Sequence, residues 1–309
     1  MADFTESIDR KKSAFVALVG RPSVGKSTLV NLLCDAKVAI VSAVPQTTRN
    51  AVRGIVTRPE GQLVFVDTPG RHVSEKKLNK KLMDVADRAL EDSELVLYVL
   101  DSSRSPGPEE EAIAARLKDK QDRIIAAINK TDVKGADPLK INSFLDSLLP
   151  ELKASCRFEI SCYKNEGIEQ LLACLFEAAP RGDPLYPDEY YTDQEISFRI
   201  SEIIREKAIN RLREEIPHSI YVEVADLEFR QQDSPDQKRL WVRAFIITER
   251  ESQKGIIVGK GGEMIKAIGQ AARKELNSIF DWKIDLDLRV KTSKDWRHDD
   301  RVLKKITGS

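Results

Sequence analysis

Histidine and cysteine are scarce in this sequence, and their scarcity argues against whole classes of site. The 309 residues include three histidines and four cysteines. The cysteines form no C-x-x-C pair and have no histidine close by in sequence; they are Cys34, Cys156, Cys162 and Cys174. We therefore expect reduced thiols rather than a zinc site or a disulfide framework. So few histidines also argue against a histidine-centred metal site or a Ser-His-Asp triad.

A long apolar run, a signal peptide and a net charge are missing as well. The longest apolar runs have the length of strands, whereas a membrane span needs about 20 residues. The segment Met1–Glu6 lacks the basic-then-apolar order of a signal peptide, so we expect a cytoplasmic protein. The 50 basic and 50 acidic residues balance, so any contact with nucleic acid must come from a local basic face. The length suits about two domains.

A glycine loop follows the first apolar run. The run Ala14–Val19 leads into Gly-Arg-Pro-Ser-Val-Gly-Lys-Ser-Thr, and Leu29–Leu33 continues as a helix. The pattern G-x-x-x-x-G-K-[ST] predicts a phosphate-binding loop when it lies between a strand and a helix, as it does here. In such a loop, main-chain N–H groups and the N-terminus of the helix bind a polyphosphate. Lys26 is expected to reach the terminal phosphates, and the Ser27 hydroxyl to ligate Mg²⁺. The expected phosphate-binding residues are Gly20, Arg21, Ser23, Val24, Gly25, Lys26, Ser27 and Thr28.

Short apolar runs alternate with amphipathic stretches through the first half of the chain. This alternation predicts an α/β fold with a mostly parallel sheet covered by helices on both faces. Ligands then bind at the carboxyl ends of the strands. The predicted strands are Phe15–Val19, Leu63–Val66, Leu95–Leu100, Ile124–Ile128 and Phe158–Ile160, and the predicted helices include Leu78–Leu90, Glu109–Leu117 and Leu139–Leu149.

Three further motifs each follow a predicted strand. Asp67-Thr68-Pro69-Gly70 offers a carboxylate that can hold Mg²⁺ through water and the Gly70 N–H for the last phosphate. Asn129-Lys130-Thr131-Asp132 offers a carboxylate that can accept from the ring N–H and the amino group of guanine. Ser161, Cys162 and Tyr163 are placed to close over the base with backbone N–H groups. Each motif alone is typical of an ordinary loop, but their order after successive strands indicates a guanine-nucleotide site.

A polar segment with two threonines lies between the first two motifs. We interpret Pro45–Asn50 as a first switch, ordered by a triphosphate and released by hydrolysis. A second switch is expected from Gly70 into Arg71–Lys77. We assign Mg²⁺ to Ser27, Thr48 and Asp67, although the sequence does not decide between Thr47 and Thr48. The residues assigned to catalysis are Lys26, Thr48, Asp67 and Gly70.

The second half of the chain has a different order of elements. Turn-forming residues at 181–192 predict a linker between a first domain, 1–180, and a second, 193–309. The second domain is predicted to contain a helix, a hairpin, a helix, a Gly-x-x-Gly loop, a helix and a strand. Their ranges are Gln194–Leu212, Ile220–Leu227, Leu240–Ile247, Ser252–Val258, Gly259–Gly262, Glu263–Leu276 and Ile284–Val290. This order resembles a type II KH domain throughout.

The glycine loop of the second half suits single-stranded RNA. Glycines let the main chain approach a nucleotide backbone, and Lys260 adds charge. The residues before the loop form either a floor for bases or part of the core. In the basic tail, Trp296 stacks on a base or packs on its own domain. The expected RNA-binding residues are Ile256, Ile257, Val258, Gly259, Lys260, Gly261, Gly262, Lys291, Lys294 and Trp296.

Together these motifs resemble translation-factor-type GTPases. The Gln-Thr-Thr-Arg switch, Asp-Thr-Pro-Gly and the Lys-x-x-x-x-Trp ending from Lys291 to Trp296 resemble the Era family in particular. The resemblance implies hydrolysis of GTP with Mg²⁺, and binding of single-stranded RNA near the 3′ end of small-subunit rRNA. It also implies a role in small (30S) ribosomal subunit assembly and 16S rRNA maturation.

Three positions depart from the family pattern. Ser23 stands where asparagine is common, which puts potassium stimulation in doubt, and Cys162 replaces an alanine. Arg71 follows Gly70 and is either an internal arginine finger or a solvated switch residue.

Other classes of protein remain open from the residues alone. They are a phosphotransferase with the same phosphate loop, a signalling GTPase whose second domain binds protein or membrane, and an RNA-binding protein with a vestigial nucleotide site. We expect a monomer, and the sequence leaves a peripheral membrane contact open.

Overall fold

The computed structural model describes residues 11–44, 47–69, 77–230 and 238–307. These residues form two compact units. The first contains the chain up to Ala39, the stretch that begins at Ala51, and Leu82–Asp193. The second contains the described part of Ile40–Asn50, the first turn of the helix that begins at Lys77, and the chain from Gln194 onward. The segment Ile40–Asn50 is therefore packed with residues that come much later in the sequence.

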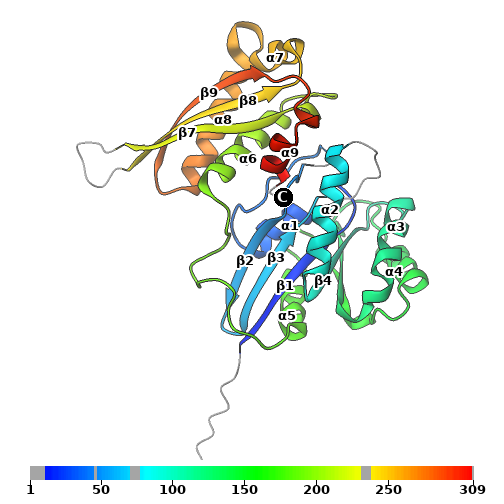
Figure 1. Cartoon of the computed structure of the whole chain (residues 1–309). Helices are drawn as coiled ribbons and strands as arrows, with labels where there is room; N and C mark the ends of the chain where they lie inside the picture. The colour runs from blue at the N-terminus through cyan, green and yellow to red at the C-terminus, as the bar shows by residue number, and fades with distance from the viewer. Residues whose placement is uncertain (1–10, 45–46, 70–76, 231–237, 308–309) are drawn as a thin grey trace, which may run out of the picture. The chain divides into compact units, whose positions relative to one another are not determined.

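A six-stranded sheet forms the centre of the first unit (Figure 1). The strand order is β2-β3-β1-β4-β5-β6, and all neighbours are parallel except β2 and β3. The predicted parallel sheet is confirmed. The strands are β1 (Lys12–Val19), β2 (Val52–Arg58), β3 (Gly61–Asp67), β4 (Leu95–Asp101), β5 (Ile124–Asn129) and β6 (Arg157–Glu159).

Strand β2 is missing from the sequence-based prediction because it lies at the edge of the sheet. Its arginines, Arg53 and Arg58, interrupt the apolar run and pair instead with the carboxylates of Asp193 and Glu169, at 2.7 and 2.9 Å. Such residues are tolerated in β2 because their side chains stay partly exposed, 47% for Arg53 and 35% for Arg58.

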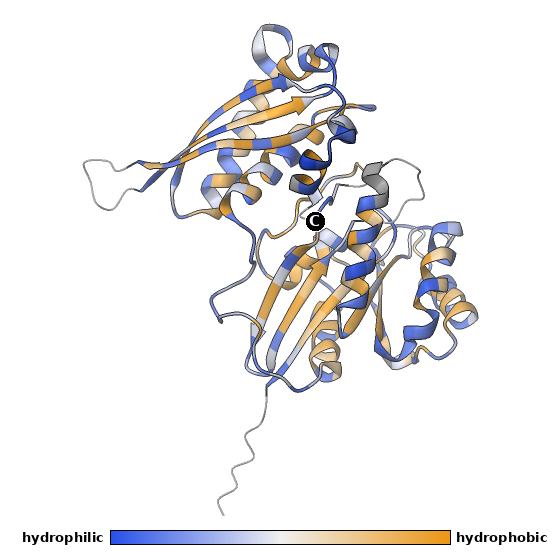
Figure 2. Cartoon of the chain, in the orientation of Figure 1, coloured by the Kyte–Doolittle hydropathy of each residue, from blue (hydrophilic) through white to orange (hydrophobic). Residues whose placement is uncertain are grey.

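The interior of the first unit lies between the sheet and its helices. Every residue of β3, β4 and β5 is buried, as the near-continuous apolar runs predict (Figure 2). Side chains of β4 and β5 pack on α3 and α4 through Tyr98, Leu100, Ile113 and Ile141. The helices are α1 (Lys26–Leu33), α2 (Lys77–Glu91), α3 (Pro108–Leu117), α4 (Pro138–Leu148) and α5 (Ile168–Ala178).

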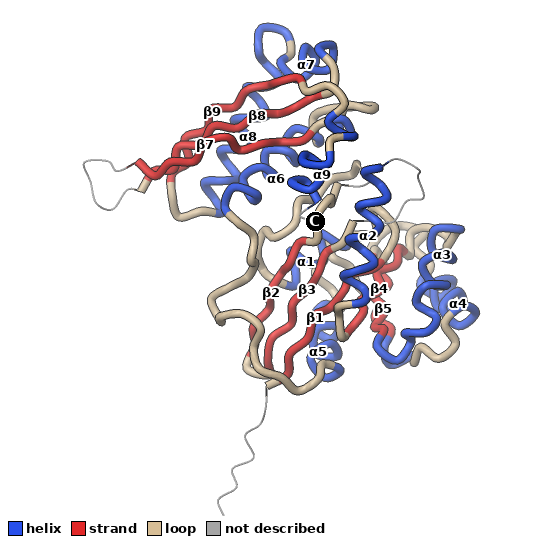
Figure 3. The backbone as a smooth tube through the Cα atoms, in the orientation of Figure 1, coloured by secondary structure: helices blue, strands red, loops and turns tan. Residues whose placement is uncertain are grey.

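The second unit contains a three-stranded sheet with α6 and α8 on one face and α9 against residues of the other (Figure 1). Strands β7 and β8 are antiparallel, and β8 and β9 are parallel. Isoleucines of α6 and the apolar face of α8 pack on Leu240, Val242 and Ala244 of β8. The elements are α6 (Ile196–Ile209), β7 (Tyr221–Arg230), β8 (Arg239–Thr248), α7 (Glu251–Val258), α8 (Glu263–Ile279), β9 (Lys283–Thr292) and α9 (Asp300–Thr307). This is the predicted order with α9 added (Figure 3).

The segment predicted as a linker lies against the first sheet. The Gln62 side chain in β3 accepts from the N–H groups of Leu185 and Tyr186, both at 2.8 Å. In β2, the Ile55 N–H donates to the Tyr191 carbonyl at 2.9 Å. Residues 185–191 therefore run along β2 and β3. Within the described stretches, no helix combines the length and apolar character needed to cross a bilayer.

Candidate nucleotide and RNA sites

The loop between β1 and α1 has left-handed backbone conformations at three positions. The φ angles are +156° at Gly20, +63° at Ser23 and +107° at Gly25. A Cβ on Gly20 would lie 2.4 Å from the Val99 carbonyl oxygen, and one on Gly25 would lie 2.4 Å from Asn129 Nδ2. Conformation and space therefore both require glycine at the two ends of the loop.

Lys26 begins α1 with its side chain folded into this loop. Its ammonium donates to the carbonyls of Gly20 and Arg21, at 2.7 and 3.0 Å, and the residue is 6% exposed. Burial lowers the pKa of Lys26 to about 8, while the charge of Asp67 acts in the opposite direction. A buried cation of this kind is stabilised when anionic phosphate oxygens replace the carbonyls.

Ser27 and Asp67 bring two oxygens together beside the loop. The Ser27 hydroxyl donates to Asp67 Oδ2 at 2.7 Å, and Asp67 is fully buried at the end of β3. Hydroxyl and carboxylate oxygens are ligands that Mg²⁺ prefers, so this donor set fits the ion. Among the described residues, no three His, Cys, Asp or Glu side chains converge on one point. Gly70 and Arg71 lie outside the described residues.

The loop after β5 is tied to the phosphate loop. Asn129 donates from Nδ2 to the Val24 carbonyl at 2.8 Å, and its Oδ1 accepts from the Cys162 N–H at 3.2 Å. The Lys130 ammonium donates to the Ser23 carbonyl at 2.8 Å. The structure thus brings three motifs that are distant in sequence to one edge of the sheet.

The carboxylate of Asp132 is oriented by a neighbouring hydroxyl. Its Oδ1 accepts from the Ser161 hydroxyl at 2.6 Å, and the same hydroxyl accepts from the Lys164 N–H at 3.0 Å. Burial raises the pKa of the neighbouring Cys162 thiol to about 12, so this cysteine is a small neutral side chain. Tyr163 is 90% exposed, and its predicted contact with a base stays a prediction.

Asp101 was missed by the sequence analysis, although it ends β4 at the same edge. It is 3% exposed and accepts from the Lys130 ammonium at 2.7 Å and from the Ser103 N–H at 3.0 Å. Arg21 lies 3.6 Å from the same carboxylate and 2.5 Å from that of Glu110. Burial alone would raise the pKa of Asp101, but the hydrogen bonds from Lys130 and Ser103 outweigh burial and lower it. Its place directly after a buried strand was the signal that could have identified it.

The two candidate threonines belong to the second unit. The Thr47 hydroxyl donates to the Val44 carbonyl at 2.6 Å, and Thr48 is 9% exposed. Pro45 and Gln46 lie outside the described residues. The assignment of Thr48 to the metal therefore stays a prediction.

The glycine loop of the second unit joins α7 to α8. All three of its glycines have positive φ, +74° at Gly259, +62° at Gly261 and +82° at Gly262. A Cβ on Gly259 would lie 2.8 Å from the Cβ of Met264, so the contact between α7 and α8 requires this glycine. Gly261 and Gly262 face open space, and Lys260 is exposed beside them. Their main chain is accessible to a partner's backbone.

The residues before this loop divide into core and surface. Ile257 is fully buried in the core of the second unit, so its assignment to a base-binding floor is wrong. Ile256 is 52% exposed, and Val258 is half-buried. The period of the helix explains the division, because α7 is a short amphipathic helix with one face on the sheet.

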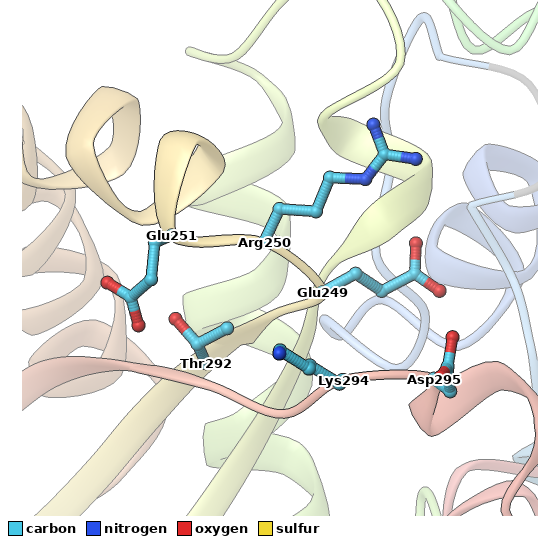
Figure 4. A pocket seen from close by; sticks show the side chains of 6 residues that line it. All are labelled: Glu249, Arg250, Glu251, Thr292, Lys294 and Asp295. Carbon is cyan, nitrogen blue, oxygen red and sulfur yellow. The ribbon is translucent and has the colours of Figure 1, made fainter.

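The tail residues are not gathered at the glycine loop. Trp296 is 1% exposed and packs on Tyr221, with ring centroids 4.9 Å apart, so its assignment to base stacking is wrong and its packing alternative holds. The ammonium of Lys291 lies over the Phe245 ring. Lys294 lines a hollow at the start of α7, whereas the glycine loop is at the opposite end of that helix (Figure 4). The hollow has mixed charge and is lined by Glu249, Arg250, Glu251, Thr292, Lys294 and Asp295.

Each of the two units has a sequence that is similar to a known protein family. Residues 15–130 match a family model described as 50S ribosome-binding GTPase, and residues 215–297 match a KH domain model. The chain is 48% identical over 295 residues to GTPase Era of Treponema denticola, covering 96% of this chain and 99% of that protein. The chain belongs to the Era family of GTPases. GTPase Era of Borreliella burgdorferi (strain ZS7) is 44% identical over the same shares of the two chains.

Solved Era structures have the same fold. An Era structure in complex with MgGDPNP and nucleotides 1506–1542 of 16S ribosomal RNA is similar with a TM-score of 0.89 and 33% identity. It covers 96% of this chain and 98% of that one. A single-residue variant of Aquifex aeolicus Era bound to GDP·AlF4⁻ has a TM-score of 0.88 and 34% identity, with the same coverage. The predicted family, fold and second-domain type are confirmed.

Proposed function

We propose that this Era-family GTPase hydrolyses GTP and uses the bound nucleotide to control its binding of single-stranded RNA at the 3′ end of 16S rRNA. Through this cycle it assists assembly of the small ribosomal subunit. The main support is the junction of the phosphate loop with the loop after β5, through Asn129 and Lys130. The Era structure with nucleotides 1506–1542 of 16S rRNA supports the choice of RNA. Such a role requires a cytoplasmic protein.

Guanine is selected by the carboxylate of Asp132. A carboxylate oriented by the Ser161 hydroxyl can accept from the ring N–H and the amino group of guanine together. Adenine has neither donor at these positions, so a charged acceptor would be left unpaired. An unpaired buried acceptor costs about 1–3 kcal/mol or more, which makes the discrimination steep.

Hydrolysis depends on charge neutralisation and positioning. In the reaction, water attacks the terminal phosphorus, the bond to the bridging oxygen breaks, and GDP and phosphate leave. Lys26 is placed to neutralise the phosphates, and Ser27 and Asp67 would hold Mg²⁺, which supplies further positive charge. Thr48 would complete the metal site while the triphosphate is bound. With no strong general base among the residues assigned here, unassisted turnover is expected to be slow.

The nucleotide part of the proposal is tested by calorimetry on nucleotide-stripped protein. We expect binding of GTP and no comparable binding of ATP. Asp132→Asn should reduce GTP affinity and improve binding of xanthosine triphosphate, because the amide can donate where the carboxylate accepted. Equal affinity for GTP and ATP would refute guanine recognition. Phosphate release with water as sole acceptor separates a GTPase from a phosphotransferase.

The RNA part is tested with two substitutions at one open position. Gly261→Asp and Gly261→Asn impose a similar backbone cost at φ +62°, but only aspartate adds a charge that repels phosphate. In filter binding with a 16S rRNA 3′ fragment, we expect the aspartate variant to bind at least about tenfold more weakly than the asparagine variant. Equal RNA affinity in both variants and the parent would favour a second domain that binds protein or membrane.

A further inference from the structure

The side chain of Arg21, in the phosphate loop, is paired with two carboxylates from other elements of the first unit. Its Nε lies 2.5 Å from Oε1 of Glu110, in the first turn of α3. Its Nη2 lies 3.6 Å from Oδ2 of Asp101, at the end of β4. The guanidinium therefore bridges β4 and α3, and it connects both of them to the phosphate loop.

Both carboxylates are withdrawn from solvent. The side chain of Asp101 is 2% exposed and that of Glu110 is 7% exposed. Glu110 Oε2 accepts from the Gly107 N–H at 3.0 Å, so each of the two Glu110 oxygens has a partner. An ionised carboxylate in such a place requires a cation, because an unpaired buried charge is strongly destabilising. Arg21 supplies that cation to Glu110.

A second cation connects the same loop to Asp101. The Lys130 ammonium donates to Asp101 Oδ2 at 2.7 Å and to the Ser23 carbonyl at 2.8 Å. Asp101 is therefore connected to the loop at two positions, Arg21 and Ser23. The φ angle of +63° at Ser23 is unfavourable for serine, so the surroundings must stabilise this loop conformation. We call Arg21, Asp101, Glu110 and Lys130 the charge network.

The conformation of the loop also fixes the cation that is expected to meet the phosphates. The Lys26 ammonium donates to the carbonyls of Gly20 and Arg21, at 2.7 and 3.0 Å. One of its two carbonyl partners thus belongs to the residue whose side chain is held by the charge network. A shift of the main chain at Arg21 would displace Lys26 as well.

We infer that Arg21 is a positioning residue for the nucleotide: its guanidinium stays in the charge network when the nucleotide binds, and its main chain alone serves the phosphates. The inference rests on the proposed function. Arginine suits this place because its planar guanidinium can pair with two carboxylates at once, whereas the ammonium of lysine is a point charge. With the charge network complete, the loop is preformed, and binding does not have to order it.

The decisive variant is Glu110→Gln in the full-length protein, because two roles of Arg21 predict opposite results for it. If the guanidinium bound phosphate directly, removal of a neighbouring negative charge would leave affinity unchanged or raise it. If Arg21 acts through the charge network, the same change loosens the loop. We expect the affinities for GDP and for a non-hydrolysable GTP analogue each to fall about tenfold.

Substitutions of Arg21 test whether the two side chains act as one unit. Arg21→Gln should lower both affinities at least about tenfold. The double variant Arg21→Gln, Glu110→Gln should bind like Arg21→Gln within about threefold, because both changes remove the same interaction. Losses that multiply would show that the two residues act independently and would overturn the inference. Arg21→Lys should have an affinity between those of Arg21→Gln and the parent.

Binding rates separate positioning from direct contact and from loss of folded protein. A loop that is preformed only part of the time lowers the association rate constant by that fraction. Loss of a direct phosphate contact would mainly speed dissociation. In stopped-flow measurements with fluorescent GDP, we expect the loss in Glu110→Gln to appear in association. Partial unfolding would lower the amplitude and leave both rate constants unchanged, which would contradict the positioning role.

The matched control is Arg116→Gln, at the other end of the same helix. Arg116 lies in the last turn of α3, pairs with Asp87 at 2.8 Å and has a side chain that is 44% exposed. Its affinities should stay within about twofold of the parent. A Glu110→Gln affinity equal to or above that of the parent would overturn the role of Arg21 while leaving the GTPase intact. If Arg21→Gln does not fold, the double variant is compared with Glu110→Gln instead, and a further loss beyond about threefold would overturn the inference equally. If the parent protein binds no guanine nucleotide, the proposed function itself fails.

Discussion

The carboxylate of Asp101 is predicted to position the base-binding loop without touching the nucleotide. Asp101→Asn keeps the shape of the side chain and removes its charge. Lys130 then loses a charged partner at 2.7 Å, and an amide replaces one of the carboxylate oxygens near its ammonium. Lys130 connects the loop after β5 to the phosphate loop through the Ser23 carbonyl, so both loops should become less well ordered.

The size of the effect follows from the burial of the pair. The Asp101 side chain is 2% exposed and that of Lys130 30% exposed, so solvent screens the bond weakly. A hydrogen bond between charged groups at such a site contributes about 1.5–3 kcal/mol. Lys130 keeps its bond to the Ser23 carbonyl, so we expect the lower end of this range, about 1.5 kcal/mol. That loss corresponds to about tenfold weaker nucleotide binding.

The assay is equilibrium titration with fluorescent GDP and a GTP analogue, followed by single-turnover hydrolysis at saturating GTP. Both affinities should fall equally and the hydrolysis rate should persist, because the lost interaction acts alike on ground state and transition state. Asp146→Asn is the control: Asp146 pairs with Arg157, is not bonded to Lys130 and has a side chain that is 68% exposed, so its affinities should stay within about threefold. Asp101→Asn affinities within twofold of the parent, or a loss confined to one nucleotide, would refute the positioning role.

Three further outcomes are expected. Phosphate binding favours the charged form of Lys26, whose pKa in the free protein is lowered to about 8. Between about pH 7, where the terminal phosphate is deprotonated, and that pKa, affinity should change little, and above it affinity should fall by up to about tenfold per pH unit. Competition with inorganic triphosphate measures this without titration of the base. Gly25→Ala should weaken nucleotide binding about 100-fold, since φ +107° costs about 1–3 kcal/mol and the new methyl group displaces Asn129; titration with GDP would show a normal affinity if the conformation were not required. Trp296→Ala should lower the free energy of unfolding of the second unit by about 3–5 kcal/mol in urea titrations, and a loss below about 1 kcal/mol would contradict its place in the core.

Much of the fold was predictable because buried strands have apolar sequences, and such apolar runs recur along the chain. Strands β4 and β5 are buried on both faces, so their sequences are apolar throughout and easily recognised. Strand β2 and helix α9 have no such signal. Because of Arg53 and Arg58, the sequence of β2 resembles that of a loop. Helix α9 is short, and its apolar side packs on Trp296 and Phe245. The apolar residues of α9, Val302, Leu303 and Ile306, do have helical spacing, but a helix of eight residues is too short for this pattern to stand out.

Some residues of the candidate site could be assigned from sequence motifs, whereas others could be assigned only from the burial of their side chains. Residues that meet phosphate or base follow strands in fixed motifs, so Lys26, Asn129 and Asp132 could be assigned to one edge of the sheet from the sequence. Side-chain burial decided the remaining assignments. Ile257 and Trp296 look like RNA contacts in a basic or glycine-rich context, yet both are in the core. Composition near a motif indicates neither which way a side chain points nor what covers it.

Arg49 shows why a motif can be recognised before its role is understood. Its neighbours Thr47 and Thr48 have a chemical reason to follow a phosphate loop, whereas an arginine at that position has none within the first unit. The reason appears only when the carbonyls of His218 and Ile220 are placed beside it, and these come from the other half of the chain. The partners that explain the position of Arg49 are therefore far away from it in sequence. Motif positions that local chemistry leaves unexplained should therefore be examined for partners in distant parts of the chain.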